Sequence, residues 1–126
     1  MTRIRLKPKG YEKICKLVDI RDNGWCIICH TTQGIQHHHV IFRSACGSDL
    51  PENLVCLCNN CHSICAHGKT SKKWQKMFIE YLNDSKQKAY HDVINKEVIK
   101  IVKRYGINEK VRCINGEQAN DGEISN

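Results

Sequence analysis

Hydrophobic residues recur at helical spacing in three segments of the chain. Residues 10–22, 71–83 and 86–105 each place apolar side chains at steps of three and four along one stripe. This spacing is typical of amphipathic helices, so we expect a helix over each segment. Because only Asn83-Asp84-Ser85 separates the second helix from the third, these two are predicted to form a C-terminal helical hairpin.

The region between these helices has a strand-like pattern instead. Residues 35–42 combine β-branched and aromatic residues with three histidines, and residues 54–57 form a short apolar run. Both are typical of short strands. A short helix is expected over residues 60–66, with Gly68 as its stop signal. The predicted fold class is therefore a small α+β domain, with a core at about residues 25–68 flanked by an N-terminal helix and a helical hairpin.

Charge is unevenly distributed along the 126 residues, whose formal net charge is +7. Basic residues dominate residues 1–16 and 69–104, whereas residues 115–126 carry only acidic charges. We expect residues 1–9 to be a flexible basic arm, residues 10–114 a single domain and the end a disordered acidic tail. A basic body indicates a polyanionic partner, most often nucleic acid, although such a surface can also serve solubility alone.

Nine cysteines are many for a chain of this length, but their arrangement argues against a disulfide scaffold. The count is odd, no N-terminal apolar run resembles a signal peptide, and four cysteines fall in C-x-x-C pairs. No stretch approaches the ~18 apolar residues of a membrane span. We therefore expect a reduced, soluble, cytoplasmic protein that has no membrane partner.

Two C-x-x-C pairs mark the ends of the central region, and such pairs can close one tetrahedral zinc site. They are formed by Cys26, Cys29, Cys58 and Cys61. The 28 residues between the pairs exceed the ~15–20 of common zinc ribbons, which suits an inserted strand–loop–strand unit with its own function. We predict a structural zinc on these four cysteines, although Cys56 and Cys65 are near enough in sequence to substitute for one of them.

Three consecutive histidines, His37 to His39, lie in the predicted strand between the cysteine pairs. Neighbouring strand residues point to opposite faces, so one of His38 and His39 can bind a metal while the other faces a water molecule. His62 follows the last cysteine and can supply a second ligand. His67 lies five residues further on, which suits one helix face less well than a spacing of four. It can serve as a third ligand only if the helix ends there.

Taken together, these residues resemble the HNH endonuclease family. The resemblance covers about residues 25–68, and small phage-type members also have cysteine pairs and flanking helices. It rests on the two cysteine pairs, His38-His39-Val40, Asn53-Leu54-Val55, Leu57-Cys58-x-x-Cys61-His62 and His67-Gly68. The resemblance implies a ββα-metal (His-Me finger) core, in which two short strands and a helix surround one catalytic metal. In this chain the four-cysteine zinc site would clamp that core.

The resemblance also implies a role for each matching residue. His39 would be the general base, and Asn53 would orient this base and brace the long loop. His38 and His62 would bind the catalytic divalent ion, with His67 as a further ligand one residue beyond the family's frequent spacing. The implied ion is Mg²⁺, Mn²⁺, Zn²⁺ or Ni²⁺, in addition to the structural zinc.

Phosphodiester hydrolysis needs an activated water and stabilisation of negative charge. A histidine can activate water near neutral pH, and a divalent ion with open positions can bind phosphate and the leaving oxygen. Basic side chains add affinity for DNA that does not depend on sequence. Arg43 resembles a basic residue of related nucleases, with a loop salt bridge as its alternative role. The candidate DNA contacts are Arg3, Arg5, Lys7, Lys9, Arg43, Lys72 and Lys73.

The sequence therefore predicts a metal-dependent DNA endonuclease or nickase, monomeric and encoded by a phage or prophage. Two other interpretations stay open. A non-catalytic, zinc-dependent DNA-binding module would use the same cysteines and basic residues, but gives no reason for the histidines and Asn53 to occur together. A nuclease subunit of a larger phage or restriction machine would cut only with its partner, and phage packaging proteins are partners of that kind.

Overall fold

The computed structural model describes residues 3–107, so the predicted tail at residues 115–126 lies outside the described part. The helices are α1 (Pro8–Arg21), α2 (Asn59–Cys61), α3 (Ser71–Leu82) and α4 (Ser85–Tyr105). The strands are β1 (Arg5–Leu6), β2 (Ile35–His39), β3 (Leu54–Cys58) and β4 (Gly106–Ile107). Short 3-10 turns at Arg43–Ala45 and Pro51–Asn53 and a π turn at His62–Ala66 complete the described part. Four helices and two small antiparallel sheets confirm the small α+β class.

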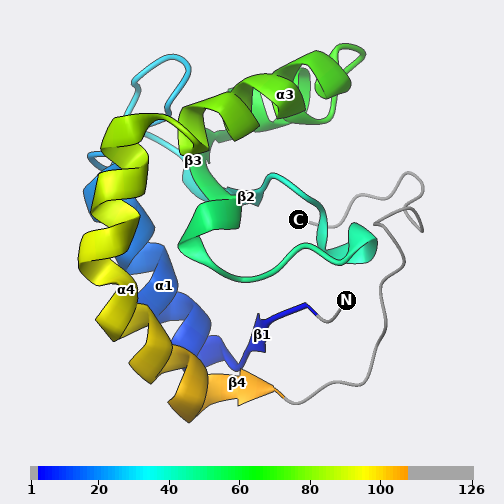
Figure 1. Ribbon diagram of the computed structural model, residues 1–126. Helices are drawn as coiled ribbons and strands as arrows, with labels where there is room; N and C mark the ends of the chain where they lie inside the picture. The colour runs from blue at the N-terminus through cyan, green and yellow to red at the C-terminus, as the bar shows by residue number, and fades with distance from the viewer. Residues whose placement is uncertain (1–2, 108–126) are drawn as a thin grey trace.

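The central sheet is the antiparallel pair β2–β3, and it divides the core into two parts. Every residue of β3 is buried. Val55 and Leu57 pack with Phe78 of α3, whereas Leu54 and Cys56 pack with residues of α1 and α4. Since side chains alternate along a strand, the hairpin is covered on both faces, by α3 and by α1 with α4 (Figure 1).

Helices α3 and α4 do not form the closely packed hairpin that their short connection predicts. Figure 1 shows α4 running alongside α1, while α3 extends away from their junction. The Asp84 carboxylate caps α4 by accepting a hydrogen bond from the Lys86 backbone N–H (3.1 Å). From that turn the buried face of α4, which includes Ile101, packs against Ile14 and Val18 of α1. The hairpin prediction was wrong because the two amphipathic helices bury their apolar faces on opposite sides of the sheet.

The N-terminal segment is not the flexible arm expected for residues 1–9, at least from residue 3 onward. Strand β1 pairs with β4, and the Lys7 backbone N–H donates to the Tyr105 carbonyl oxygen (2.8 Å). Pro8 opens α1 instead of ending an arm, because proline suits the first position of a helix. No helix within residues 3–107 has the length and apolar character needed to cross a lipid bilayer.

Candidate metal centres

The four cysteines of the C-x-x-C pairs meet at the end of β3, and we call them the cysteine group. Their Sγ atoms lie within 4.8 Å of one another, and those of Cys29 and Cys58 are 3.7 Å apart. This separation is far longer than the ~2.05 Å of a disulfide bond. It matches the edge of ~3.8 Å of a tetrahedron with Zn–S bonds of ~2.3 Å. The group can therefore hold a tetrahedral metal ion, as the spacing predicted.

Backbone N–H groups in the two cysteine turns point at sulfur. The N–H groups of Ile28 and Cys61 lie 3.4 Å from the Sγ atoms of Cys26 and Cys58. Burial disfavours a thiolate at Cys26, but backbone donors outweigh it and lower the pKa of this thiol to about 7. Burial and the neighbouring thiols raise the pKa of Cys61. A bound dication would supply the positive charge that four gathered thiolates need.

The remaining described cysteines lie outside this group. Cys56 contacts Asp19 instead, so it does not substitute for one of the four. Cys15 and Cys65 are free thiols that join none of the possible metal groups within residues 3–107. Cys46 is disulfide-bonded, so the expectation of a fully reduced chain fails at this residue.

A second group, the histidine trio, consists of His38, His62 and His67. Their nearest ring nitrogens lie within 4.8 Å of one another. The ring centroids of His62 and His67 are 4.5 Å apart, and that of His38 lies 5.2 and 5.5 Å from them. His38 is 2% exposed in β2, whereas the other two are only partly buried. Three imidazoles, two of them at the surface, can bind a divalent ion and leave open positions on it.

A π turn brings His67 beside His62. The turn spans His62–Ala66, and the His67 backbone N–H donates to the His62 carbonyl oxygen at 3.1 Å. A π turn bonds residue i to residue i+5, so a five-residue spacing returns to the same side of the chain. A Cβ atom at Gly68 would lie 2.0 Å from the Ile64 carbonyl oxygen, so the chain can leave the turn only with glycine here. The unusual spacing of His67 is thus accommodated.

The trio is neutral at neutral pH. Burial, together with the nearby His62 and His67, lowers the pKa of His38 to about 3. Burial also lowers the pKa of His62 and of His67. Since metal ions bind the neutral imidazole, the three side chains are in the protonation state that a ligand requires.

His39 occupies the opposite face of β2, toward α1, as strand alternation predicts. It is 1% exposed, and its ring stacks on Tyr11 with 5.8 Å between centroids. Its Nε2 lies 2.9 Å from Oδ1 of Asp49, while its Nδ1 is buried with no hydrogen-bond partner among the described residues. When the Asp49 carboxylate accepts the Nε2–H, the lone pair stays on Nδ1. That nitrogen is then the one able to accept a proton.

Asp49, which the sequence pattern did not single out, joins several segments. It is fully buried, and it accepts hydrogen bonds from the Leu6 backbone N–H (3.0 Å) and from Arg5 (3.3 Å). The Arg43 guanidinium lies 3.4 Å away. Burial disfavours the charged carboxylate, but these donors, His39 first among them, lower the pKa of Asp49. In sequence this aspartate looks like an ordinary turn residue after Gly47 and Ser48, so no local signal marks it.

Asn53 braces the long loop, as the family resemblance implies. Its Oδ1 accepts from the Ile41 N–H (2.8 Å), and its Nδ2 donates to the carbonyl oxygens of Ile41 and Ser48 (both 3.0 Å). A Cβ atom at Gly47 would lie 1.7 Å from the Ile41 carbonyl oxygen, so the loop closes only with glycine there. Among the described hydrogen bonds, the side chains that contact the His39 ring are Asp49 and, at 3.4 Å, the Nε of Arg43, and not Asn53.

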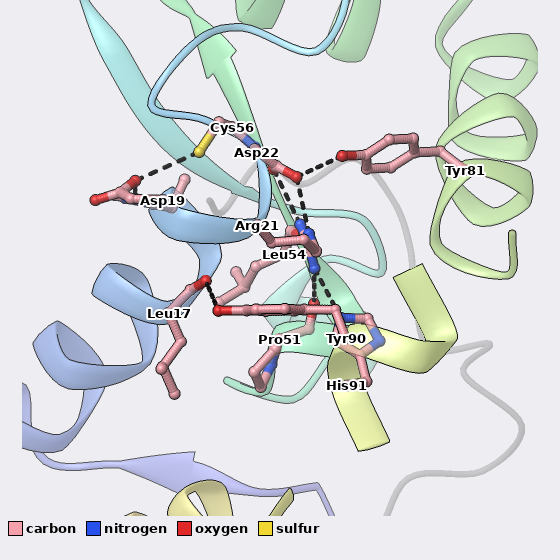
Figure 2. A network of polar contacts seen from close by, with 11 residues as sticks. Leu17, Asp19, Arg21, Asp22, Pro51, Leu54, Cys56, Tyr81, Tyr90 and His91 are labelled. Atoms are coloured by element: carbon pink, nitrogen blue, oxygen red, sulfur yellow. Dashed lines mark hydrogen bonds and ion pairs between the residues drawn. The ribbon is translucent and has the colours of Figure 1, made fainter. Parts of the chain in front are cut away.

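A buried polar network fixes the turn that carries Asn53 (Figure 2). Arg21, at the end of α1, donates to the carbonyl oxygens of Pro51 (2.8 Å) and Leu54. Its Nε also pairs with Oδ1 of Asp22 at 2.8 Å. Both ends of the 3-10 turn are therefore tied to α1, which holds Asn53 against the loop.

The basic residues expected to contact DNA fall into two sets. Arg3 donates to the Arg43 carbonyl oxygen (2.6 Å), and Arg43 lies over the Tyr11 ring, with 5.3 Å from Cζ to the centroid. Together with the contact of Arg43 to Asp49, this shows the loop salt bridge that was the alternative for Arg43. The lysines are exposed near the starts of α1 and α3. They are Lys7, Lys9, Lys72 and Lys73.

Comparisons of the chain with protein-family models, with curated proteins and with solved structures gave no match. The chemistry of the site must therefore be inferred from its residues. These comprise the cysteine group, the histidine trio, and the His39–Asp49 pair, all carried or flanked by the β2–β3 sheet. The cysteine group can enclose a metal, whereas the trio can present one to a ligand.

Proposed function

We propose that the protein is a metal-dependent DNA endonuclease or nickase of the HNH type. The observation that carries this proposal is that two neighbouring histidines of β2 have different surroundings on its two sides. His38 faces two further histidines on one side, and His39 on the other side holds a buried ring nitrogen with no hydrogen-bond partner among the described residues. Hydrolysis of a phosphodiester requires a cation site and a positioned base, and here neighbouring residues of one strand contribute to the two.

In this proposal the histidine trio binds one divalent ion, and a structural zinc in the cysteine group joins the two ends of the hairpin. The bound ion would supply positive charge to the phosphate and the leaving oxygen. Imidazole ligands suit Zn²⁺ and Ni²⁺, whereas Mn²⁺ and Mg²⁺ prefer oxygen ligands and would keep more bound water. The order strand, strand, helical turn around the trio agrees with the ββα-metal core that the resemblance implies.

His39 acts as the general base in this mechanism. Asp49 accepts the Nε2–H, fixes the tautomer and stabilises the imidazolium that forms when Nδ1 takes a proton from water. Asn53 keeps the Ile41–Ser48 loop closed beside the base. Arg5 and Arg43 keep Asp49 charged, which preserves its ability to orient the ring.

DNA as the substrate is supported by charge. The chain carries a formal net charge of +7, and exposed lysines open two helices. Such side chains neutralise phosphates without reading bases, so binding should weaken steeply as salt increases. Part of the arginine charge is already used internally, on Asp49 and on loop carbonyl oxygens.

A plasmid-cleavage assay with a panel of divalent ions tests the proposal. Wild-type protein should convert supercoiled DNA to nicked or linear forms, and EDTA should stop the reaction. His39→Ala should lower the rate roughly 10²- to 10⁴-fold, the usual contribution of a general base. The matched control is His30→Asn, because asparagine tolerates the positive φ of 65° that His30 adopts. Equal cleavage by wild type and His39→Ala would refute the mechanism.

The second candidate is a zinc-dependent DNA-binding module without catalysis. The observation that favours it is the burial of the proposed base pair, since His39 and Asp49 are both almost fully enclosed. Under this alternative the pair is a structural link between β2 and the loop. A salt-dependent shift of DNA in a gel, with no cleavage under any divalent ion, would support the module over the nuclease.

A further inference from the structure

A third group of possible ligands lies on the α1 side of the sheet. It consists of Asp19 from α1, His37 from β2 and Cys56 from β3, whose ligand atoms lie within 4.8 Å of one another. His37 and Cys56 are direct partners across the β2–β3 ladder. Asp19 Oδ1 lies 2.7 Å from His37 Nε2 and 3.4 Å from Cys56 Sγ. Figure 2 shows the Cys56 sulfur directed at Asp19.

We propose that Asp19, His37 and Cys56 form a third metal site, which binds Zn²⁺ with one coordination position left for water. Thiolate, imidazole and carboxylate are the three ligand types that zinc takes in proteins. The thiolate and imidazole make the set too soft for Mg²⁺ or Ca²⁺, which prefer oxygen. The two anionic ligands also neutralise the dication.

The observed separations fit this ion with a small adjustment. Tetrahedral zinc, with bonds of ~2.3 Å to sulfur and ~2.0 Å to oxygen and nitrogen, has edges of ~3.5 Å between S and O and ~3.3 Å between N and O. The distance of 3.4 Å from Cys56 to Asp19 already matches the first edge. The contact of 2.7 Å from His37 to Asp19 must lengthen. The Asp19 side chain can accommodate this, because it is 43% exposed.

The site is separate from the two already described. His37 and His38 point to opposite faces of β2, so the trio lies across the sheet from this group. Cys56 takes no part in the cysteine group. A metal here would fasten α1 to both strands, next to Asp22, whose carboxylate already accepts the Cys56 backbone N–H (3.0 Å). The exposed edge at Asp19 supplies the route of entry, and the inference does not depend on nuclease activity.

The test counts zinc in full-length protein lacking the trio. The variant His62→Ala/His67→Ala should retain two zinc ions per chain after gel filtration, one in the cysteine group and one in the third site. Adding His37→Gln should lower the count to one. Adding Asp19→Asn to the same His62→Ala/His67→Ala protein keeps the side-chain shape but removes the charge. It should lower the affinity for the second zinc ion by roughly tenfold or more. Glu12→Gln, another carboxylate change on α1, should leave the count at two.

Cobalt gives an independent readout in the otherwise unaltered chain. With zinc in the cysteine group, added Co²⁺ should produce a thiolate-to-cobalt absorption band that Cys56→Ser abolishes and Cys65→Ser retains. Circular dichroism establishes that each variant is folded. A count of one zinc in His62→Ala/His67→Ala, or a count of two that His37→Gln leaves unchanged, would overturn the proposal. The group would then be an Asp–His ion pair beside a buried thiol.

Discussion

The cysteine group and the histidine trio lie on one short hairpin but differ in how they are built. Two local turns supply the cysteines, and each turn places its own pair of sulfur atoms within four residues of chain. The trio takes one residue from a strand and two from a π turn. Four sulfurs enclose a metal, whereas three nitrogens leave it accessible. The two groups therefore differ in the number of ligands they offer a metal ion and in how close together in sequence those ligands lie.

The largest expected effect comes from opening the cysteine group. Cys26→Ser should abolish cooperative thermal unfolding, because structural zinc contributes ~10–16 kcal/mol in small domains, comparable to the ~5–15 kcal/mol stability of a whole protein. Circular dichroism and zinc analysis measure this, and Cys65→Ser is the matched control because Cys65 joins no described metal group. A Cys26→Ser protein with the same melting temperature as wild type would contradict the stabilising role expected of the cysteine group.

The next effect concerns His39, the general base of the proposed mechanism. Asp49→Asn should lower plasmid cleavage roughly 10²-fold, because the amide cannot fix the His39 tautomer or stabilise its protonated form. Plasmid-cleavage rates measured over a range of pH should show this loss of activity at the pH where the wild-type protein is most active. Ser48→Ala is the control, since it removes a loop contact to the Ile4 backbone N–H without touching His39. If both variants lose activity equally, Asp49 acts only through the fold of the loop.

A smaller effect should separate the two metal groups directly. His67→Ala should weaken divalent-ion binding to the trio by roughly 10- to 100-fold, while the zinc in the cysteine group stays in place. Isothermal titration with Mn²⁺ or Ni²⁺, together with zinc analysis, gives both quantities. Ser63→Ala changes an exposed residue of the same π turn and should leave both unchanged. Unaltered ion affinity in His67→Ala would remove this residue from the site.

The smallest effect is on pH dependence. The pKa of His38 in the fold is about 3, below the ~6.5 of an unfolded histidine. Between pH ~3 and pH ~6.5 this histidine binds more protons in the unfolded chain than in the folded one. The folded state therefore keeps its full stability above pH ~6.5 and becomes less stable as the pH falls. The melting temperature without added divalent ion should therefore drop by a few degrees from pH 7 to pH 5.5. His38→Gln should flatten this slope, with zinc content monitored; an unchanged slope would contradict the pKa shift.

Much of the site could be predicted because the sequence patterns that mark it span only a few residues. A C-x-x-C pair determines its own geometry within four residues, and strand alternation separates His38 from His39 whatever surrounds them. The loop-bracing role of Asn53 followed from the family resemblance. The apolar run at residues 54–57 also predicted a short strand, which β3 confirms.

Other features had no local signal. Asp49 is ten residues from His39, and the N-terminal segment, which was expected to be a flexible arm, donates the Leu6 backbone N–H to its carboxylate. Likewise, the amphipathic pattern of α4 predicted a helix but not which surface would cover it. Helix α4 therefore packs on α1 and does not form the predicted hairpin with α3.

By itself, the sequence determined the small α+β class, the two cysteine pairs and the opposite facing of neighbouring histidines, because these depend on backbone periodicity over a few residues. Tertiary structure alone decided that a π turn brings His67 to His62, that Asp49 holds His39, and that Asp19 meets His37 and Cys56. The contacts of Asp49 and Asp19 join residues ten or more positions apart in sequence, so the packing of the core decides whether they meet. The contact of His67 with His62 is local but depends on the π turn.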